Sequence, residues 1–300
     1  MELYKVKDVL VMMSTYNGEK YIKEQIDSII NQKHVRVVLL IRDDGSSDNT
    51  IKYILEYCNK HDNIQLIQGK NIGWKRSFMK LVYYAGNTYD YYAFADQDDI
   101  WLDNKLSSAI NKIEKYNLPM LYYSMMTQVD KNLNIMDEQQ EKHYPIKKHK
   151  ILFQNFVQGS TIVYNNLLQK TLLKYKIPKE VAHDIWLPIV ATYLGKVCFD
   201  VNSYILYRKH EDAVTVNMSN NYFKMLIHDL ISKKKVDNYA IYMLEGYEND
   251  LQITDKNYLS IVKEYKKNKF KLFFDSNVKK TSLKGTILLK LSLLFNFLES

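Results

Sequence analysis

Short apolar runs alternate with helix-spaced apolar residues along the first part of the chain. The runs are continuous, as in strands buried on both faces, and they cover Val9–Met13, Val35–Ile41, Ile64–Ile67 and Tyr91–Ala95. Between these runs, apolar residues recur at helical spacing, which predicts helices over residues 22–30, 51–58 and 74–84. This alternation predicts an α/β fold with a mostly parallel, Rossmann-like sheet flanked by helices.

The pattern changes in the middle of the chain. Three segments have the composition of strands with hairpin-like gaps, namely MLYYSMMTQVD (120–130), FVQGSTIVYN (156–165) and GKVCFD (195–200). One helix is predicted among them, over Asp184–Tyr193, and only lysine-rich helical patterns follow. We therefore expect one domain over residues 1–217, with halves near 1–118 and 119–217, and a basic helical region over residues 218–300.

Three polar clusters follow predicted strands. They are STYNGE (14–19), RDDGSSDNT (42–50) and DQDD (96–99). Ligands of open α/β sheets bind beyond the carboxyl ends of the strands, so parallel strands would bring the three clusters to one rim. Taken singly, each cluster is also explained as a turn or a helix cap that needs no ligand.

The DQDD segment places three carboxylates within four positions. Asp96 and Asp98 are two residues apart and point the same way on an extended strand end, and Asp99 opens the next loop. Like charges this close destabilise one another unless a cation or several donors lie between them. Crowded oxygen ligands suit Mg²⁺ or Mn²⁺, and an acidic surface turn is the alternative. Four histidines lack ligand spacing and are expected on the surface: His34, His61, His143 and His149.

The net charge of +8 is concentrated near the end of the chain. Between Lys256 and Lys290 there are ten lysines and two acidic residues, which accounts for the whole excess. Two cysteines, Cys58 and Cys198, do not suggest a disulfide framework. No stretch reaches the ~18 apolar residues of a membrane span, and the first apolar run is too short for a signal peptide. We expect a cytoplasmic protein.

The segment 281–300 is apolar around most of a helix. It is too short and too interrupted to cross a bilayer, so it must pack against protein or lipid. The neighbouring lysines favour peripheral contact with an anionic membrane on its inner face; docking on the rest of the chain or on a second subunit is the alternative. A nucleic-acid partner is disfavoured because the basic stretch carries no binding motif.

Several motifs together resemble family 2 glycosyltransferases with the GT-A fold. The carriers are VMMSTYNGEKYIKEQIDSIINQ, IRDDGSSDNT, NIGWKRSF and FADQDDIWLDNKL, in this order and spacing. The later HDIWLPIVATYLGKV and LYRKHEDAVT are similar to the bacterial rhamnosyltransferase-like branch, which builds cell-wall and capsular polysaccharides. The resemblance covers residues 8–215 and implies a nucleotide-sugar-binding half followed by an acceptor half.

The resemblance also implies roles for individual residues. Those expected around the nucleotide and diphosphate are Thr15, Tyr16, Asn17, Asp43, Asp44, Asn71, Gly73, Lys75 and Asp96. Asp98 and His210 would hold the metal, and Arg208 would face the diphosphate. The acceptor or sugar pocket would include His183. Separate candidates for that pocket are Trp101, Gly159, Ser160 and Trp186; core packing is the alternative for the two tryptophans, and a plain strand glycine is the alternative for Gly159. Asp184 matches the position of the family's catalytic base, where His183 replaces the more usual Glu.

The chemistry of sugar transfer is consistent with these roles. A leaving diphosphate needs positive charge, and an attacking hydroxyl needs one positioned carboxylate to take its proton. We therefore expect an inverting, metal-dependent transferase that uses a dTDP- or UDP-linked sugar and a glycan or polyprenyl-linked acceptor. Asp184 precedes an apolar helix and is equally explained as its cap. The alternatives are a sugar nucleotidyltransferase and an inactive GT-A scaffold that binds a partner transferase.

Overall fold

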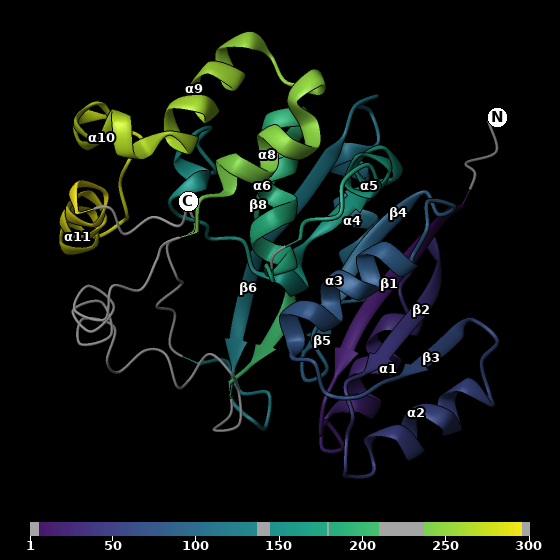
Figure 1. Ribbon diagram of the computed structural model, residues 1–300. Coiled ribbons are helices and arrows are strands. Elements are labelled where there is room, and N and C mark those ends of the chain that lie inside the picture. The colour runs from purple at the N-terminus through teal and green to yellow at the C-terminus, as the bar shows by residue number, and fades with distance from the viewer. Residues whose placement is uncertain (1–5, 137–144, 179, 210–236, 296–300) are drawn as a thin grey trace. The chain divides into compact units, whose positions relative to one another are not determined.

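The computed structural model describes residues 6–136, 145–178, 180–209 and 237–295. These residues form two compact units (Figure 1). The first contains residues up to 136 together with 157–191 and 195–209, and the second contains residues 145–156, 192–194 and 237–295. The predicted boundary at residue 217 falls between 209 and 237, outside the described residues.

The first unit is built on an eight-stranded sheet with the order β3-β2-β1-β4-β7-β6-β8-β5. Its strands are β1 (Lys7–Thr15), β2 (Val35–Asp43), β3 (Ile64–Gln68), β4 (Tyr91–Ala95), β5 (Ile100–Trp101), β6 (Met120–Val129), β7 (Val163–Asn165) and β8 (Lys196–Arg208). The first four strands run parallel, and so do β6 and β8; β7 is antiparallel to β4 and β6, and β5 is antiparallel to β8. The predicted α/β class with a mostly parallel sheet is confirmed.

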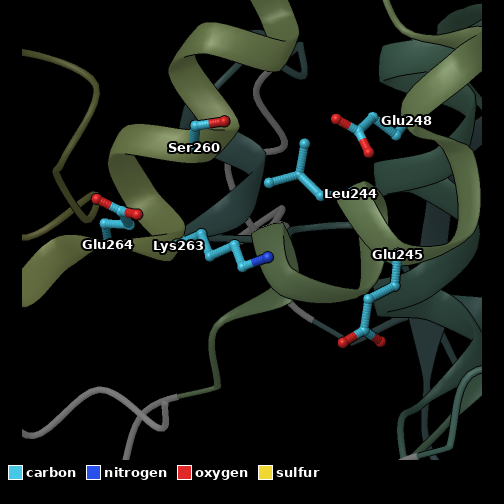
Figure 2. Close-up of a pocket in the computed structure, with 6 residues that line it drawn as sticks. All are labelled: Leu244, Glu245, Glu248, Ser260, Lys263 and Glu264. Atoms are coloured by element: carbon cyan, nitrogen blue, oxygen red, sulfur yellow. The ribbon is translucent and has the colours of Figure 1, made fainter.

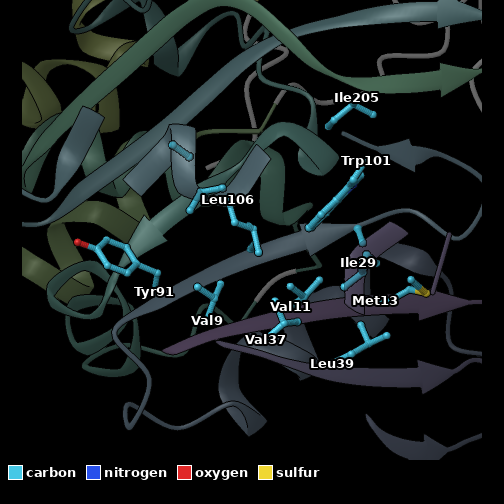
Figure 3. Packing of buried hydrophobic residues seen from close by; sticks show 14 of the residues in the cluster. Val9, Val11, Met13, Ile29, Val37, Leu39, Tyr91, Trp101, Leu106 and Ile205 are labelled. Carbon is cyan, nitrogen blue, oxygen red and sulfur yellow. The ribbon is translucent and has the colours of Figure 1, made fainter. Parts of the chain in front are cut away.

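Helices cover both faces of this sheet. They are α1 (Ile22–Ile30), α2 (Thr50–Cys58), α3 (Trp74–Tyr84), α4 (Lys105–Ile113), α5 (Asn166–Leu173) and α6 (His183–Leu194). Val9, Val11 and Met13 of β1 pack with the apolar stripes of α1 and α4 in one buried cluster (Figure 3). On the opposite face Phe78 of α3 meets Phe94 of β4 edge-on, with ring centroids 5.8 Å apart. Continuous apolar runs form these strands because both of their faces are covered.

The predicted hairpins of the second half are wrong. Only Val163–Asn165 of the segment 156–165 is a strand, and Gly159–Thr161 forms a 3₁₀ turn. β6 and β8 are parallel neighbours, which a hairpin cannot connect. Strand propensity was present in these residues, but their pairing depends on long-range contacts that a local pattern does not carry.

The second unit is mostly helical. It contains α8 (Tyr239–Tyr247), α9 (Ile253–Lys263), α10 (Tyr265–Phe274) and α11 (Leu283–Leu294), with the 3₁₀ turns η1 (Lys150–Leu152) and η4 (Glu248–Asp250). The surface prediction for His149 is wrong, because its ring stacks on Tyr258 at 3.9 Å and its Nδ1 lies 3.0 Å from the Tyr193 hydroxyl. Within the described ranges, no helix combines the length and apolarity that a bilayer crossing requires.

A cavity of about 340 Å³ lies between α8 and α9 (Figure 2). The residues that line it are Leu244, Glu245, Glu248, Ser260, Lys263 and Glu264. Its polar walls belong to the helical unit, and none of the predicted site residues lines it. Acidic residues around a hollow do not by themselves make a binding site, so we assign it no role.

Replacing Gly195 with alanine tests a close approach at the start of β8. An added Cβ would lie 2.0 Å from the Pro119 carbonyl oxygen, so the backbone would have to move. We expect Gly195→Ala to lower the free energy of unfolding by about 1–3 kcal/mol, as overpacking does, in urea denaturation. The control is Lys60→Ala at an exposed position. Equal stability of the two variants would contradict the close approach.

Candidate functional site

The three polar clusters meet at the carboxyl ends of β1, β2 and β4, as predicted. The backbone of Tyr16 exchanges two hydrogen bonds with the Gln97 side chain, at 2.9 and 3.1 Å. Asn17 donates its N–H to the Ser46 hydroxyl at 2.9 Å, and its side-chain oxygen accepts the Ser47 N–H at 2.8 Å. The first loop therefore links the other two, and we call the three loops together the acidic rim (residues 14–19, 42–50 and 96–99).

Two backbone features of the first loop permit these bonds. Asn17 has a φ of 49°, a left-handed conformation that asparagine tolerates better than most residues. A Cβ on Gly18 would lie 2.4 Å from Oε1 of Gln97, so a larger residue would push the bridging amide away. Gln97 was not among the predicted site residues. Its position between two aspartates of DQDD was the signal that could have identified it.

Asp43 is fully buried and serves the loop that follows β2. One carboxylate oxygen accepts the N–H groups of Gly45 and Ser46 at 3.0 and 2.8 Å. The other accepts the hydroxyls of Thr15 and Ser46 at 3.0 and 2.5 Å. Four donors fix this carboxylate, so Asp43 and Thr15 shape the loop predicted to receive the nucleotide.

Asp44 holds the loop before α3. Its carboxylate forms an ion pair with Arg42 at 2.5 Å and accepts the N–H groups of Ile72 and Gly73 at 2.9 and 2.8 Å. Gly73 has a φ of 83°, which favours glycine, and its N–H also lies 3.2 Å from Oδ1 of Asn71. Asp44, Asn71 and Gly73 thus come together, as predicted, and Lys75 follows in the first turn of α3.

Burial and neighbouring negative charge act together on the acidic residues after β4. Burial and the charges of Asp98 and Asp184 raise the pKa of Asp96 to about 7, against the opposing effect of the Ser160 hydroxyl. Burial likewise raises the pKa of Asp99 well above its ordinary value, with Asp96 and Asp98 adding to the effect. Asp96, Asp98, Asp184 and Ser160 are therefore neighbours, as the resemblance implied.

Asp99 faces a buried lysine that the sequence analysis did not identify. One oxygen of Asp99 accepts the Arg208 N–H at 3.3 Å, and the other has no hydrogen-bond partner among the residues that the structure describes. Lys105 is buried, with its Nζ 3.4 Å above the centre of the Trp101 ring. Burial lowers the pKa of Lys105 well below its usual value, and Asp99 opposes that shift. The sequence signal for this burial was the position of Lys105 on the apolar side of α4, one turn before Ala109.

Trp101 and Trp186 are core residues in this structure. Trp101 is 3% exposed and lies beneath Lys105, and Trp186 is fully buried. A sugar stacks on an exposed ring face, and neither ring presents one here. The core alternative for these two tryptophans therefore describes them in this structure.

Asp184 lies in the first turn of α6, after Ala182 at the N-cap. Burial raises its pKa to about 6; its own N–H, the charge of Lys75 and the Ile185 N–H act in the opposite direction. A carboxyl with this pKa is ionised at neutral pH and is still a stronger base than an exposed aspartate. The carboxylate accepts N–H groups of the first turn, so the capping alternative also holds, and the raised pKa makes the group suitable for proton abstraction as well.

His183 is held beside Asp184 by aromatic rings. Its ring lies 4.2 Å from Phe78 and 4.3 Å from Phe94, and burial lowers its pKa to about 3, so it is neutral. A Cβ on Gly159 would lie 2.3 Å from its Nε2. Gly159 and His183 are therefore packed together at the edge of the site. The next residue, Ser160, brings its hydroxyl to the Asp96 carboxylate.

Arg208 braces the acidic rim from β8. It donates to the carbonyls of Asp98 and Lys131 at 3.0 and 2.7 Å and to the Glu24 carboxylate at 2.7 Å. The guanidinium also lies 4.4 Å from the centre of the Tyr21 ring, and the side chain is 3% exposed. These bonds go to protein, so Arg208 positions the Asp98 peptide here and does not face an open diphosphate site. His210 lies outside the described residues.

The negative charge of the carboxylates after β4 suits a divalent cation, but their side chains are not arranged around a common metal position. The charge of Asp98 raises the pKa of both Asp96 and Asp99, and one Asp99 oxygen is buried without a hydrogen-bond partner in the described chain. Positive charge would relieve both conditions. However, no group of three or more His, Cys, Asp or Glu side chains within the described ranges is arranged to hold a metal.

The sheet and its acidic rim are those of a GT-A glycosyltransferase. The chain matches the family model of Glycosyl transferase family 2 over residues 10–174, and it belongs to that family. It is 31% identical over 227 residues to the dTDP-rhamnosyl transferase RfbG of Shigella flexneri, covering 69% of this chain and 75% of that protein.

One further relative is similar in sequence, and two solved structures are similar in fold. The chain is 30% identical over 165 residues to the UDP-Glc:alpha-D-GlcNAc-diphosphoundecaprenol beta-1,3-glucosyltransferase WfgD of Escherichia coli, covering 54% of this chain and 55% of WfgD. S. aureus TarS 1–349 in complex with UDP-GlcNAc superposes with a TM-score of 0.59 at 20% identity, over 97% of this chain and 80% of that chain. The mannosyltransferase PcManGT of Pyrobaculum calidifontis, in complex with GDP-Man and Mn²⁺, gives 0.55 at 14% identity, over 98% and 75%.

Substituting Arg208 tests its role as a brace. Lysine keeps the charge but cannot reproduce the planar set of bonds to Asp98, Lys131 and Glu24. We expect Arg208→Lys to lower the free energy of unfolding by about 1–3 kcal/mol in urea denaturation. Arg36→Lys is the matched control, because Arg36 pairs with Asp8 at the surface. A loss of the same size in both variants would contradict the assignment.

The raised pKa of Asp184 predicts a pH-dependent stability. Its pKa in the folded chain exceeds that of an unfolded aspartate, so the protonated form is favoured by folding. This contribution is complete below about pH 4 and is lost as the pH rises through about 6. Asp184→Asn should therefore gain stability relative to the parent protein between pH 4 and pH 8, by roughly 3 kcal/mol.

Urea denaturation at both pH values measures this difference. Lys60→Gln, which leaves every carboxyl in place, is the control and should follow the parent protein. An Asp184→Asn variant whose stability relative to the parent is the same at both pH values would contradict the burial of a charged Asp184.

Proposed function

We propose that this chain is an inverting, metal-dependent glycosyltransferase that moves a sugar such as rhamnose from a nucleoside diphosphate to a glycan or lipid-linked acceptor. The observation that carries the proposal is Asp184: a buried carboxyl with a pKa of about 6, electrostatically linked to both Asp96 and Lys75. A positioned base beside a group of carboxylates and a lysine is the set of groups that sugar transfer requires.

The donor would lie on the acidic rim. The Tyr16 side chain is about half exposed there (49%), so its ring is free to stack on a base. Asp43 and Asp44 fix the two loops on either side, leaving backbone groups to bind the ribose and diphosphate. RfbG is named for dTDP-linked rhamnose, WfgD for UDP-linked glucose, and TarS was solved with UDP-GlcNAc. These names favour dTDP or UDP in this chain.

Asp184 would accept the proton of the acceptor hydroxyl as that oxygen attacks the anomeric carbon. The new carbon–oxygen bond forms on the face opposite the departing diphosphate, whose bond to the sugar breaks with both electrons. A single displacement of this kind inverts the anomeric centre. Burial assists because it raises the basicity of Asp184 and keeps water from competing for the same proton.

The departing diphosphate needs positive charge. Lys75 supplies part of it from α3, close enough to Asp184 to lower its pKa. Mg²⁺ or Mn²⁺ held by Asp98 would supply further charge when bound. PcManGT was solved with Mn²⁺, which supports a cation in a protein of this fold.

The acceptor would belong to cell-surface polysaccharide synthesis. WfgD is named for an acceptor on diphosphoundecaprenol, a membrane lipid, which favours work at the inner face of the cytoplasmic membrane. A nucleotidyltransferase is disfavoured by the family match. An inactive scaffold is disfavoured because Asp184 acts electrostatically on Asp96 and burial raises the pKa of both.

Two substitutions separate donor binding from catalysis. We expect Asp98→Ala to abolish Mn²⁺-dependent binding of UDP or dTDP, because it removes the expected cation ligand. We expect Asp184→Asn to bind the nucleotide normally and to lose transfer by about 10²–10⁴-fold, since the base is gone. Calorimetry measures binding, and transfer is followed with a panel of nucleotide sugars.

The parent protein should gain activity as the pH rises through about 6, with the pKa of Asp184. Glu56→Gln on the exposed side of α2 is the control and should change neither binding nor transfer. Near-normal turnover of Asp184→Asn would remove the base assignment. A parent protein that binds neither UDP nor dTDP with manganese would remove the donor assignment.

A further inference from the structure

The lysines near the end of the chain divide into two groups. Three of them are used inside the helical unit: Lys256 pairs with Glu248 at 2.6 Å, Lys290 donates to the Phe273 carbonyl at 2.6 Å, and Lys280 donates to the Phe153 carbonyl. The exposed members are Lys263, Lys266, Lys267, Lys271, Lys279 and Lys284. The exposed lysines outnumber the two acidic residues of this stretch, of which Glu264 pairs with Lys267 and Asp275 accepts the Tyr258 hydroxyl.

Large apolar side chains lie among these lysines. On α10, Phe270 is 70% exposed and Phe274, one turn later, is 80% exposed. Residues at this spacing share one side of a helix, and Lys266 and Lys267 lie on the same side one turn earlier. The buried residues of α10, Tyr265 and Leu272, occupy the other side. The outward side of α10 is therefore apolar and basic together.

The next helix repeats this combination. On α11, Leu283 is 77% exposed and Ile287 is 49% exposed, again one turn apart, with Lys284 beside them. The two helices are packed together, since Lys290 of α11 bonds to Phe273 of α10 (Figure 1). The surface of a soluble protein rarely exposes several large apolar side chains close together unless they bind a partner.

We propose that the exposed sides of α10 and α11 bind the surface of an anionic lipid bilayer, with Phe270 and Phe274 inserted and the lysines on the headgroups. The positive charge of this surface favours an anionic bilayer over a second copy of the chain. A second copy of this chain would bring two basic surfaces together, and their repulsion opposes such a dimer. Anionic headgroups complement the lysines, and the acyl boundary accepts the aromatic rings.

This inference rests on the proposed function in one respect: a lipid-linked acceptor explains why the protein would bind a membrane. The binding itself needs neither donor nor catalysis. Co-sedimentation of the full chain with vesicles therefore tests it separately. One set of vesicles contains phosphatidylcholine alone, and the other contains equal parts of phosphatidylcholine and phosphatidylglycerol. We expect binding to the second set that weakens as salt is added.

Two double variants address the two components of the surface. Lys266→Gln with Lys271→Gln should weaken binding to anionic vesicles by about 25-fold, at about fivefold for each lysine. Phe270→Gln with Phe274→Gln should weaken it at least about tenfold, because the inserted rings are lost. Both changes are at exposed positions, so the fold and nucleotide binding by calorimetry should remain as in the parent protein.

Matched controls come from the first unit. Lys52→Gln with Lys60→Gln removes the same charge at exposed positions of α2 and its end, and Tyr84→Gln removes an exposed ring. Both should bind vesicles as the parent does. Equal binding of the parent to neutral and anionic vesicles would overturn the proposal, as would α10 variants that bind like the controls.

Analytical ultracentrifugation examines the competing occupant. A parent protein that dimerises, with α10 variants that do not, would assign the surface to a second copy and overturn the lipid proposal. A monomeric parent that binds anionic vesicles supports it. Vesicle binding without any nucleotide binding would contradict the proposed function and leave the lipid surface standing.

Discussion

The site depends on one constraint. Several aspartate side chains at the carboxyl ends of parallel strands are buried away from water. Five aspartates are buried or nearly so around this edge, and the chain treats them in two ways. Asp43 and Asp44 are surrounded by hydrogen-bond donors and by Arg42, which makes their burial compatible with charge. Around Asp96, Asp99 and Asp184 the hydrogen bonds and charges do not offset burial, so the pKa of each is raised. The first pair shapes the loops, and the other three keep the reactivity.

This division connects stability with function. A carboxyl whose charged form is disfavoured costs the fold free energy at neutral pH, and a bound cation or substrate restores it. Two basic residues stabilise this acidic edge. Arg208 of β8 donates a hydrogen bond to the Asp98 carbonyl, and Lys105 places a buried amine near Asp99. Rigid support around an incompletely satisfied centre is typical of sites prepared for a charged ligand.

Much of this architecture was predictable because its signals are local. Tyr91–Ala95 and Trp74–Tyr84 were predicted with the bounds that the structure has, since both are short, strongly apolar patterns between polar breaks. The rim followed from the rule that parallel strands end together. Pairing of β6 with β8 was not predictable, because it depends on residues more than seventy positions apart. Neither was the burial of Lys105 or the stacking of His149 on Tyr258, since residue type alone does not reveal which neighbours arrive from elsewhere in the chain.

The amide of Gln97 and the side chain of Asn17 tie three loops from three different strands into one network. Such loops do not vary independently. Exchange of the first loop for the equivalent loop of a relative would break bonds to both others, and exchange of either other loop would break its bonds to the first, so the three loops would have to be exchanged as one set. The same dependence extends to Gly18, where one added carbon atom would displace the bridging amide of Gln97.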